Sequence, residues 1–180
     1  YEPELNFLIK KLIKNGDIIL DVGANVGIHT VAFALAAGTG HVYAFEPVSE
    51  MAKRLSENCA LNRIDNVTLV PCALGARDEK LEMSVNVAGV ALEGTSSLVQ
   101  SVHVIEKPEY YQSRTVKVRQ LDGLVEELGI SDRIDFIKMD VEGFETYILS
   151  EDVDGTYFGD PKAKKGGTLN YTHSLFPRTM

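Results

Sequence analysis

The 180-residue chain has little that would cross-link it or place it in a membrane. It contains only two cysteines, Cys59 and Cys72, and no tryptophan. Both cysteines lie in apolar segments, so we interpret them as small buried side chains in a reducing compartment. The longest strictly apolar run, residues 31–37, is far shorter than the roughly 18 residues that a membrane span requires. We therefore expect a cytoplasmic domain without membrane contact, disulfide or metal site.

Basic residues are also scarce. The chain has 18 Lys plus Arg against 26 Asp plus Glu, a formal net charge of −8. Proteins that bind nucleic acid neutralise its phosphates with clustered basic side chains. The one dense basic cluster here, at residues 162–165, lies near the end of the chain. Nucleic acid is therefore not an expected partner, and the 44% hydrophobic content is that of a soluble globular domain.

Hydrophobic periodicity predicts strands that alternate with helices. Short apolar runs predict strands at residues 18–22, 41–45, 67–70 and 134–139. Helical spacing of apolar residues predicts helices at 5–13, 29–37, 48–61 and 121–128. This alternation favours parallel pairing through right-handed crossovers. We predict a doubly wound, mostly parallel α/β sheet of the Rossmann-like kind.

Two segments break this rhythm. Between residues 80 and 121 the apolar period changes to two, which predicts a β-excursion inserted on the sheet. From residue 151 to 180 the chain is punctuated by glycine and has no apolar period that we can assign. We therefore expect a domain at 1–150 and an atypical or loosely ordered tail at 151–180.

A glycine loop follows the first predicted strand, with the sequence Asp21-Val22-Gly23-Ala24-Asn25-Val26-Gly27. In open α/β sheets, ligands bind at the carboxyl ends of the strands. A dinucleotide site needs glycine where Asn25 stands, and the Asp21 carboxylate would repel a pyrophosphate. A cofactor with an amino group and a sulfonium would instead be attracted, and S-adenosylmethionine is such a cofactor. The alternative is a plain turn with no ligand.

An acid at the end of the second strand strengthens the first interpretation. Glu46 follows the predicted strand at 41–45, and a carboxylate there can accept hydrogen bonds from both hydroxyls of a ribose. The alternative is that Glu46 stabilises the start of the helix that follows. Thr30, in the helix after the glycine loop, would either bind the cofactor carboxylate or cap that helix.

Five strings, in chain order, carry a family resemblance: Asp21 to Gly27, Tyr43-Ala44-Phe45-Glu46-Pro47, Ala73-Leu74-Gly75, Gly94-Thr95-Ser96-Ser97-Leu98, and Ile137-Lys138-Met139-Asp140-Val141-Glu142-Gly143-Phe144-Glu145. Together, over about residues 15–150, they resemble the FkbM family of S-adenosylmethionine-dependent methyltransferases. The resemblance implies a class I methyltransferase fold. It also implies O-methylation of a hydroxyl on a sugar or secondary metabolite.

Carried over by position, the resemblance implies a set of cofactor contacts. The methionine end would be lined by Asp21, Gly23, Asn25 and Gly27. Glu46 would bind the ribose. The adenine would lie near Cys72, Ala73 and Leu74.

Acids after the fourth strand are the candidates for catalysis. A hydroxyl acceptor must lose a proton, and a general base contributes on the order of 10² to 10⁴-fold to such a reaction. Asp140 ends a strand that should lie beside the first, so we predict it as the base, with Glu142 as a second catalytic acid. The alternatives are that Glu142 and Glu145 stabilise the next helix, or that the acids bind a divalent ion.

The resemblance ends at Glu145, because residues 150–180 lack the sequence pattern of the further strands that such enzymes have. One alternative to an active methyltransferase is therefore a truncated, non-catalytic scaffold. A partner chain that completes the sheet would make the protein an oligomer. A nicotinamide-dependent oxidoreductase is a further alternative, which Asp21 and Asn25 disfavour.

Overall fold

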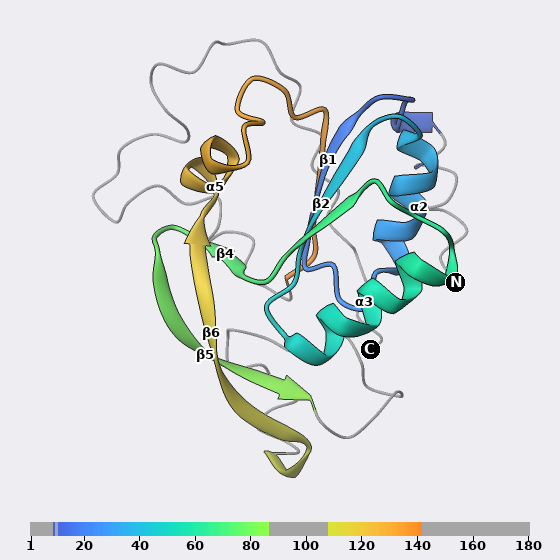
Figure 1. The fold of residues 1–180 in the computed structure, drawn as a ribbon. Coiled ribbons are helices and arrows are strands. Elements are labelled where there is room, and N and C mark those ends of the chain that lie inside the picture. The colour runs from blue at the N-terminus through green and yellow to red at the C-terminus, as the bar shows by residue number, and fades with distance from the viewer. Residues whose placement is uncertain (1–8, 10, 87–107, 142–180) are drawn as a thin grey trace, which may run out of the picture.

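The computed structural model describes residues 9, 11–86 and 108–141. Its elements alternate as predicted along the first half of the chain (Figure 1). In chain order they are β1 (Ile18–Val22), α2 (Ile28–Ala37), β2 (His41–Phe45), α3 (Ser49–Leu61), β3 (Val67–Val70), β4 (Ala73–Gly75), β5 (Glu79–Asn86), the 3₁₀ helix η2 (Pro108–Tyr110), β6 (Tyr111–Gln120), α5 (Leu121–Glu127) and β7 (Phe136–Met139).

Four strands form a parallel sheet in the order β3-β2-β1-β7. In the register of this sheet, Val22 of β1 lies beside Phe45 of β2 and Met139 of β7, so these strands end at one level. The sequence prediction of a doubly wound α/β fold, with the fourth parallel strand beside the first, is confirmed. The predicted bounds of β1, β2 and β3 are also confirmed without change.

Alternating side chains of this sheet form an apolar core on each face. On one face, Ile19 and Val42 pack with Phe33 of α2, and Ala44 packs with Leu55 and Cys59 of α3. On the other face, β1 and β2 side chains pack with Leu124 and Val125 of α5. Cys59 and Cys72 are buried free thiols, as predicted. Within the described ranges, no helix is both long and apolar enough to cross a membrane.

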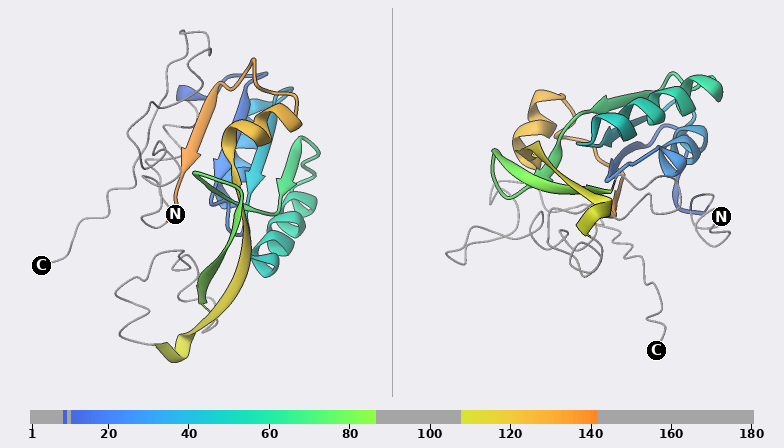
Figure 2. Two further views of the ribbon diagram at one scale, coloured as in Figure 1. Left: turned by 90° about the vertical axis from the view of Figure 1, so that its left-hand side faces the viewer. Right: turned by 90° about the horizontal axis from the view of Figure 1, so that it is seen from below.

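The predicted excursion at 80–121 needs a correction. Its strands are not added to the parallel sheet but form a second sheet, in the order β4-β6-β5. β5 and β6 pair antiparallel over eight residues each and extend past the carboxyl ends of the parallel strands (Figure 2). A three-residue strand that we did not predict, β4, pairs parallel with the end of β6. It brings the chain from the end of β3 into the second sheet.

The turn between β4 and β5 is held to the end of β6 by one side chain. Asp78 accepts hydrogen bonds from the Gln120 backbone N–H at 2.7 Å and from the Arg119 guanidinium at 2.8 Å. These bonds join residues about 40 positions apart, which is why a local pattern could not reveal the separate sheet. The 151–180 tail, and most of the helix expected at 5–13, lie outside the described residues.

Candidate functional site

The candidate site lies at the carboxyl edge of the parallel sheet, where β1, β2 and β7 end together (Figure 2, left). The glycine loop follows β1, Glu46 follows β2 and Asp140 follows β7. The Asp140 N–H donates to the Val22 carbonyl at 3.1 Å, and the Asn25 N–H donates to the Glu46 carboxylate at 2.8 Å. The structure therefore brings together the three groups that the sequence analysis selected separately.

Close contacts with neighbouring elements explain two glycines of the loop. Gly23 has φ +73°, and a Cβ on it would lie 2.1 Å from the Asp140 carbonyl oxygen. Gly27 has φ +84°, and a Cβ on it would lie 2.7 Å from Leu55 of α3. Asn25, between them, also has a left-handed backbone, with φ +51°. The loop thus depends on glycine for its turn and for its contact with the neighbouring elements.

Asp21 does not face the solvent. Its side chain is fully buried and accepts a hydrogen bond from the Thr30 hydroxyl at 2.6 Å. The Lys138 ammonium lies 3.2 Å from the other carboxylate oxygen, within ion-pair range although not aligned as a hydrogen bond. The charge of Asp21 is therefore compensated inside the protein. This corrects our premise that Asp21 itself offers a free negative charge to a ligand.

Thr30, like Asp21, is fully buried and is bound inside the protein. Its hydroxyl donates a hydrogen bond to Asp21 and does not cap α2. Direct contact of Asp21 or Thr30 with a cofactor stays a prediction. The role that the structure shows for both side chains is to join the end of β1 to the first turn of α2.

Glu46 is buried differently, since no cation contacts it among the described residues. Its two carboxylate oxygens accept hydrogen bonds from the backbone N–H groups of Asn25 and Val48, each at 2.8 Å. The bond to Val48 shows the helix-stabilising role that we named as the alternative, because Val48 is the N-cap of α3. A carboxylate has about four acceptor sites, so both oxygens keep capacity for a further donor.

Burial sets the protonation behaviour of Glu46. Loss of hydration raises the pKa of Glu46, and the hydrogen bonds from Val48 and Asn25 oppose this rise. The charge of Asp21 raises the pKa of Glu46 a little further, and that of Lys138 lowers it. Glu46 is thus a buried acceptor whose charged form gains from a hydrogen-bond donor or a positive charge.

Two more acceptors lie at the same edge of the parallel sheet as Glu46. The side-chain oxygen of Asn25 is buried without a hydrogen-bond partner among the described residues. The Asp140 side chain is about one third exposed, at 36%, and its carboxylate lies 3.9 Å from the Lys138 ammonium. A ligand at this edge therefore meets oxygen acceptors, which suit an ammonium, a sulfonium or hydroxyl groups better than a phosphate.

The residues expected near an adenine ring lie mainly in the core. Cys72 and Leu74 are almost fully buried in the apolar cluster on the α5 face, and Ala73 starts β4. Burial raises the pKa of the Cys72 thiol to about 11, so this thiol is not a nucleophile at neutral pH. Contact of these three residues with an adenine stays a prediction.

Lys138 is the site residue that the sequence analysis missed. It lies in β7 directly opposite Asp21, its side chain is only 8% exposed, and its ammonium also contacts the Val22 and Gly23 carbonyls. The available signal was a lysine inside an otherwise apolar strand. Glu142, the second predicted catalytic acid, lies outside the described residues.

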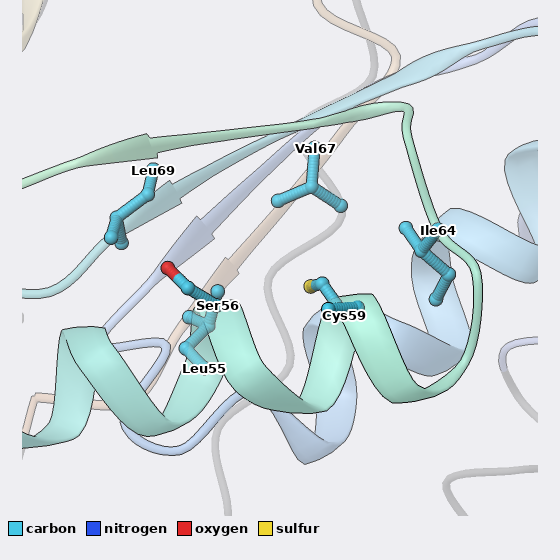
Figure 3. A pocket seen from close by; sticks show the side chains of 7 residues that line it. Leu55, Ser56, Cys59, Ile64, Val67 and Leu69 are labelled. Atoms are coloured by element: carbon cyan, nitrogen blue, oxygen red, sulfur yellow. The ribbon is translucent and has the colours of Figure 1, made fainter.

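A crevice of about 220 Å³ lies elsewhere, between α3 and β3 (Figure 3). Most of its lining is apolar and includes Leu55, Cys59, Ile64, Val67 and Leu69. None of the predicted site residues lines it. This crevice is therefore distinct from the strand-end site.

Comparison with known families agrees with the site geometry. The profile of the "Methyltransferase FkbM domain" matches residues 21–162, which is most of the chain. The chain belongs to the FkbM methyltransferase family. The match begins at Asp21 and extends past residue 150, where we expected an atypical tail to begin.

Curated relatives include methyltransferases, and the name of one of them states a sugar acid as its substrate. The hexuronic acid methyltransferase AglP of Haloferax volcanii is 28% identical over 148 residues, which are 82% of this chain and 55% of AglP. The 2-O-methyltransferase NoeI of Sinorhizobium fredii is 27% identical over 149 residues, 79% of this chain and 60% of NoeI. The chain thus spans little more than half the length of these relatives.

Solved structures match over a smaller part. A methyltransferase of Streptococcus mutans in complex with SAH is 24% identical, with a TM-score of 0.36 and 39% of each chain covered. TYW2 of M. jannaschii in complex with AdoMet is 25% identical, with a TM-score of 0.35, over 37% of this chain and 31% of that one. We draw no argument about the site from matches this partial.

Proposed function

We propose that this chain is the cofactor-binding part of an S-adenosylmethionine-dependent O-methyltransferase whose acceptor is a hydroxyl of a sugar or secondary metabolite. Membership of the FkbM family supports methyl transfer. The name of AglP, a hexuronic acid methyltransferase, supports a sugar as the acceptor, and the name of NoeI, a 2-O-methyltransferase, supports transfer to a hydroxyl oxygen.

The observation that carries the cofactor assignment is the contact between Glu46 and the glycine loop. Glu46 accepts a hydrogen bond from the Asn25 N–H at 2.8 Å, and the buried side-chain oxygen of the same Asn25 has no partner in the part of the chain that the structure describes. These buried acceptors match ribose hydroxyls and an ammonium, which are donors, and they would repel a pyrophosphate. Glu46 would hold the ribose, and Asn25 with Gly23 would hold the amino-acid end.

When bound, S-adenosylmethionine supplies a methyl group activated by a positively charged sulfur. The chain's own contribution is alignment of the acceptor hydroxyl and removal of its proton. Asp140 is the partly exposed carboxylate at the end of β7, which suits it to accept this proton. We retain Glu142 as a proposed second acid on sequence grounds only.

Calorimetry tests the cofactor assignment. S-adenosylhomocysteine should bind the wild-type chain, and Glu46→Gln should weaken that binding about tenfold, the effect of losing one hydrogen bond to a charged group. Glu57→Gln is the matched control, because Glu57 lies on the exposed surface of α3, where it pairs with Lys53 across one helical turn. Binding of NAD without S-adenosylhomocysteine, or equal binding by both variants, would contradict the assignment.

Methyl transfer tests the reaction. With radiolabelled S-adenosylmethionine and glucuronic acid as the trial acceptor, Asp140→Asn should lower turnover by about 10² to 10⁴-fold and leave S-adenosylhomocysteine binding intact. Transfer at the wild-type rate would exclude Asp140 as the base. Tight cofactor binding without transfer to this or a 2-hydroxyl acceptor would favour the non-catalytic scaffold.

A further inference from the structure

Lys138 is a charged residue in a place where the fold does not need one. It lies in the middle of β7, on the same sheet face as Phe136, which packs against Phe33 of α2. A methionine would fill such a position, and no charged group would have to be removed from water. Burial of an ion pair is weak evidence for a stabilising role, because the cost of removing both charges from water often exceeds their attraction. The contacts of the ammonium indicate another role.

The ammonium of Lys138 is bound by the start of the glycine loop. It donates to the Gly23 carbonyl at 3.0 Å and lies 3.5 Å from the Val22 carbonyl. The Val22 carbonyl is the last of β1, and the Gly23 carbonyl is the first of the loop. A lysine has three donors and no acceptor, so carbonyls and carboxylates are the groups it can hold.

The same ammonium lies between two carboxylates, Asp21 at 3.2 Å and Asp140 at 3.9 Å. Asp21 is itself bound to Thr30 of α2. One cation therefore connects β7, the side chain at the end of β1, the first loop carbonyl and the proposed base. The close approach of Gly23 to the Asp140 carbonyl shows that the loop and the end of β7 are packed against each other here.

We propose that Lys138 is a positioning residue that clamps the start of the glycine loop to the end of β7, so that the loop has its ligand-binding shape before a ligand arrives. This inference rests on the proposed function for the identity of its ligand. A loop that is already ordered avoids the entropic cost of ordering during binding, and the gain appears as affinity. Lys138 itself is buried behind the loop and acts through it.

Two variants isolate this effect. Lys138→Met alone would leave Asp21 as a buried unpaired charge, and the resulting loss of stability would hide the positioning role. The comparison is therefore between Asp21→Asn and the double variant Asp21→Asn/Lys138→Met. Neither contains the Asp21 charge, and in Asp21→Asn the Lys138 ammonium keeps the Asp140 carboxylate as its counter-charge. The two proteins differ in the ammonium and in its contacts with the two carbonyls, with Asp140 and with the side chain at position 21.

Hydrogen exchange without ligand is the first measurement. The amides of Gly23 and Ala24 donate to the Phe45 carbonyl at 3.1 and 3.0 Å. They should exchange about tenfold faster in the double variant than in Asp21→Asn, because the loop loses a hydrogen bond to a charged donor. The Val42 amide, which donates to Asn66 at the other end of β2, is the internal control and should not change.

Binding of S-adenosylhomocysteine is the second measurement, with an expected loss of about tenfold in affinity between the same variants. Equal exchange in the two variants overturns the proposal. Faster exchange with unchanged affinity also overturns it, because Lys138 would then be a structural residue only. If the wild-type chain binds no S-adenosylhomocysteine, the proposed function fails, and the exchange comparison alone decides whether Lys138 clamps the loop.

Discussion

Each of the two sheets places one basic side chain between two carboxylates, and the two arrangements differ mainly in their access to water. At the edge of the parallel sheet, Lys138 lies between Asp21 and Asp140, and the Asp21 side chain has no exposed surface. In the second sheet, the side chain of Arg119 is 14% exposed and joins Asp78 to Glu127. These two partners are 58% and 60% exposed.

The difference shows that the same charge pattern has different consequences in the two regions. Water and salt screen the Arg119 cluster, so its pairs contribute little to stability. Solvent cannot screen Asp21, so removing its partner leaves a charge that the protein must accommodate. The buried cluster is accordingly at the candidate site, where position has to be maintained, and the exposed cluster joins a turn to a helix.

The largest expected effect is that of Lys138→Met. This change should lower the free energy of unfolding by about 3–5 kcal/mol, because it leaves Asp21 uncompensated in the core. Denaturant unfolding at neutral pH would measure it. Adding Asp21→Asn should recover most of the loss, and failure of that recovery would show that the ion pair is not the source of the effect.

Substitution of a glycine should distinguish the closely packed loop after β1 from an open position in the helix α5. Gly23→Ala should cost on the order of 3 kcal/mol, because it adds a clash with the Asp140 carbonyl to a left-handed backbone. Gly123→Ala, in α5, has nothing within 4 Å of the added Cβ and should stabilise by about 0.5–1 kcal/mol. Thermal unfolding of both variants checks the prediction, which a tolerated Gly23→Ala would contradict.

The pH dependence of stability tests the burial of Glu46. Because burial raises the pKa of Glu46, its contribution to stability is complete below the unfolded value near 4.5 and is lost as pH rises through the folded value. The free energy of unfolding of wild type minus that of Glu46→Gln should therefore decrease above pH 4.5. Affinity for S-adenosylhomocysteine should increase over the same range, since the carboxylate is the acceptor. A flat difference in stability would contradict the burial argument.

The smallest expected effect is that of Arg119→Met. Its loss of stability should be well below that of Lys138→Met and should disappear as salt approaches about 1 M, where the Debye length is about 3 Å. Urea unfolding at several salt concentrations would measure it. A loss as large as that of Lys138→Met, or one unaffected by salt, would remove the distinction between the buried and exposed clusters.

Much of the parallel sheet could be predicted from the sequence because its signals are local. The run from Ile18 to Val22 is apolar enough to be a buried strand, and the glycines after it mark a tight loop. The end of β2 before Glu46 and the start of α3 follow from equally short patterns. The second sheet could not be predicted in this way, since β4 has three residues and its partner β6 lies about 45 positions later.

At the site, the residue types were predicted better than their roles. Glu46, Asn25 and Asp140 place oxygen acceptors at the strand ends, and their contact with a cofactor or substrate stays a prediction. Asp21 was expected to present its charge to a ligand, yet Lys138 compensates it from 117 positions further along the chain (138 − 21 = 117). No spacing rule connects two residues that meet only because β1 and β7 pair.

By itself, the sequence determined the order of the elements, the glycine loop and the oxygen acceptors at the strand ends, because each depends on residues close together in the chain. Only the tertiary structure decided which carboxylate is compensated and which remains available, and that the β-excursion forms its own sheet. The physical reason is that burial and charge pairing depend on the neighbours that strand pairing brings together, and these neighbours come from distant segments.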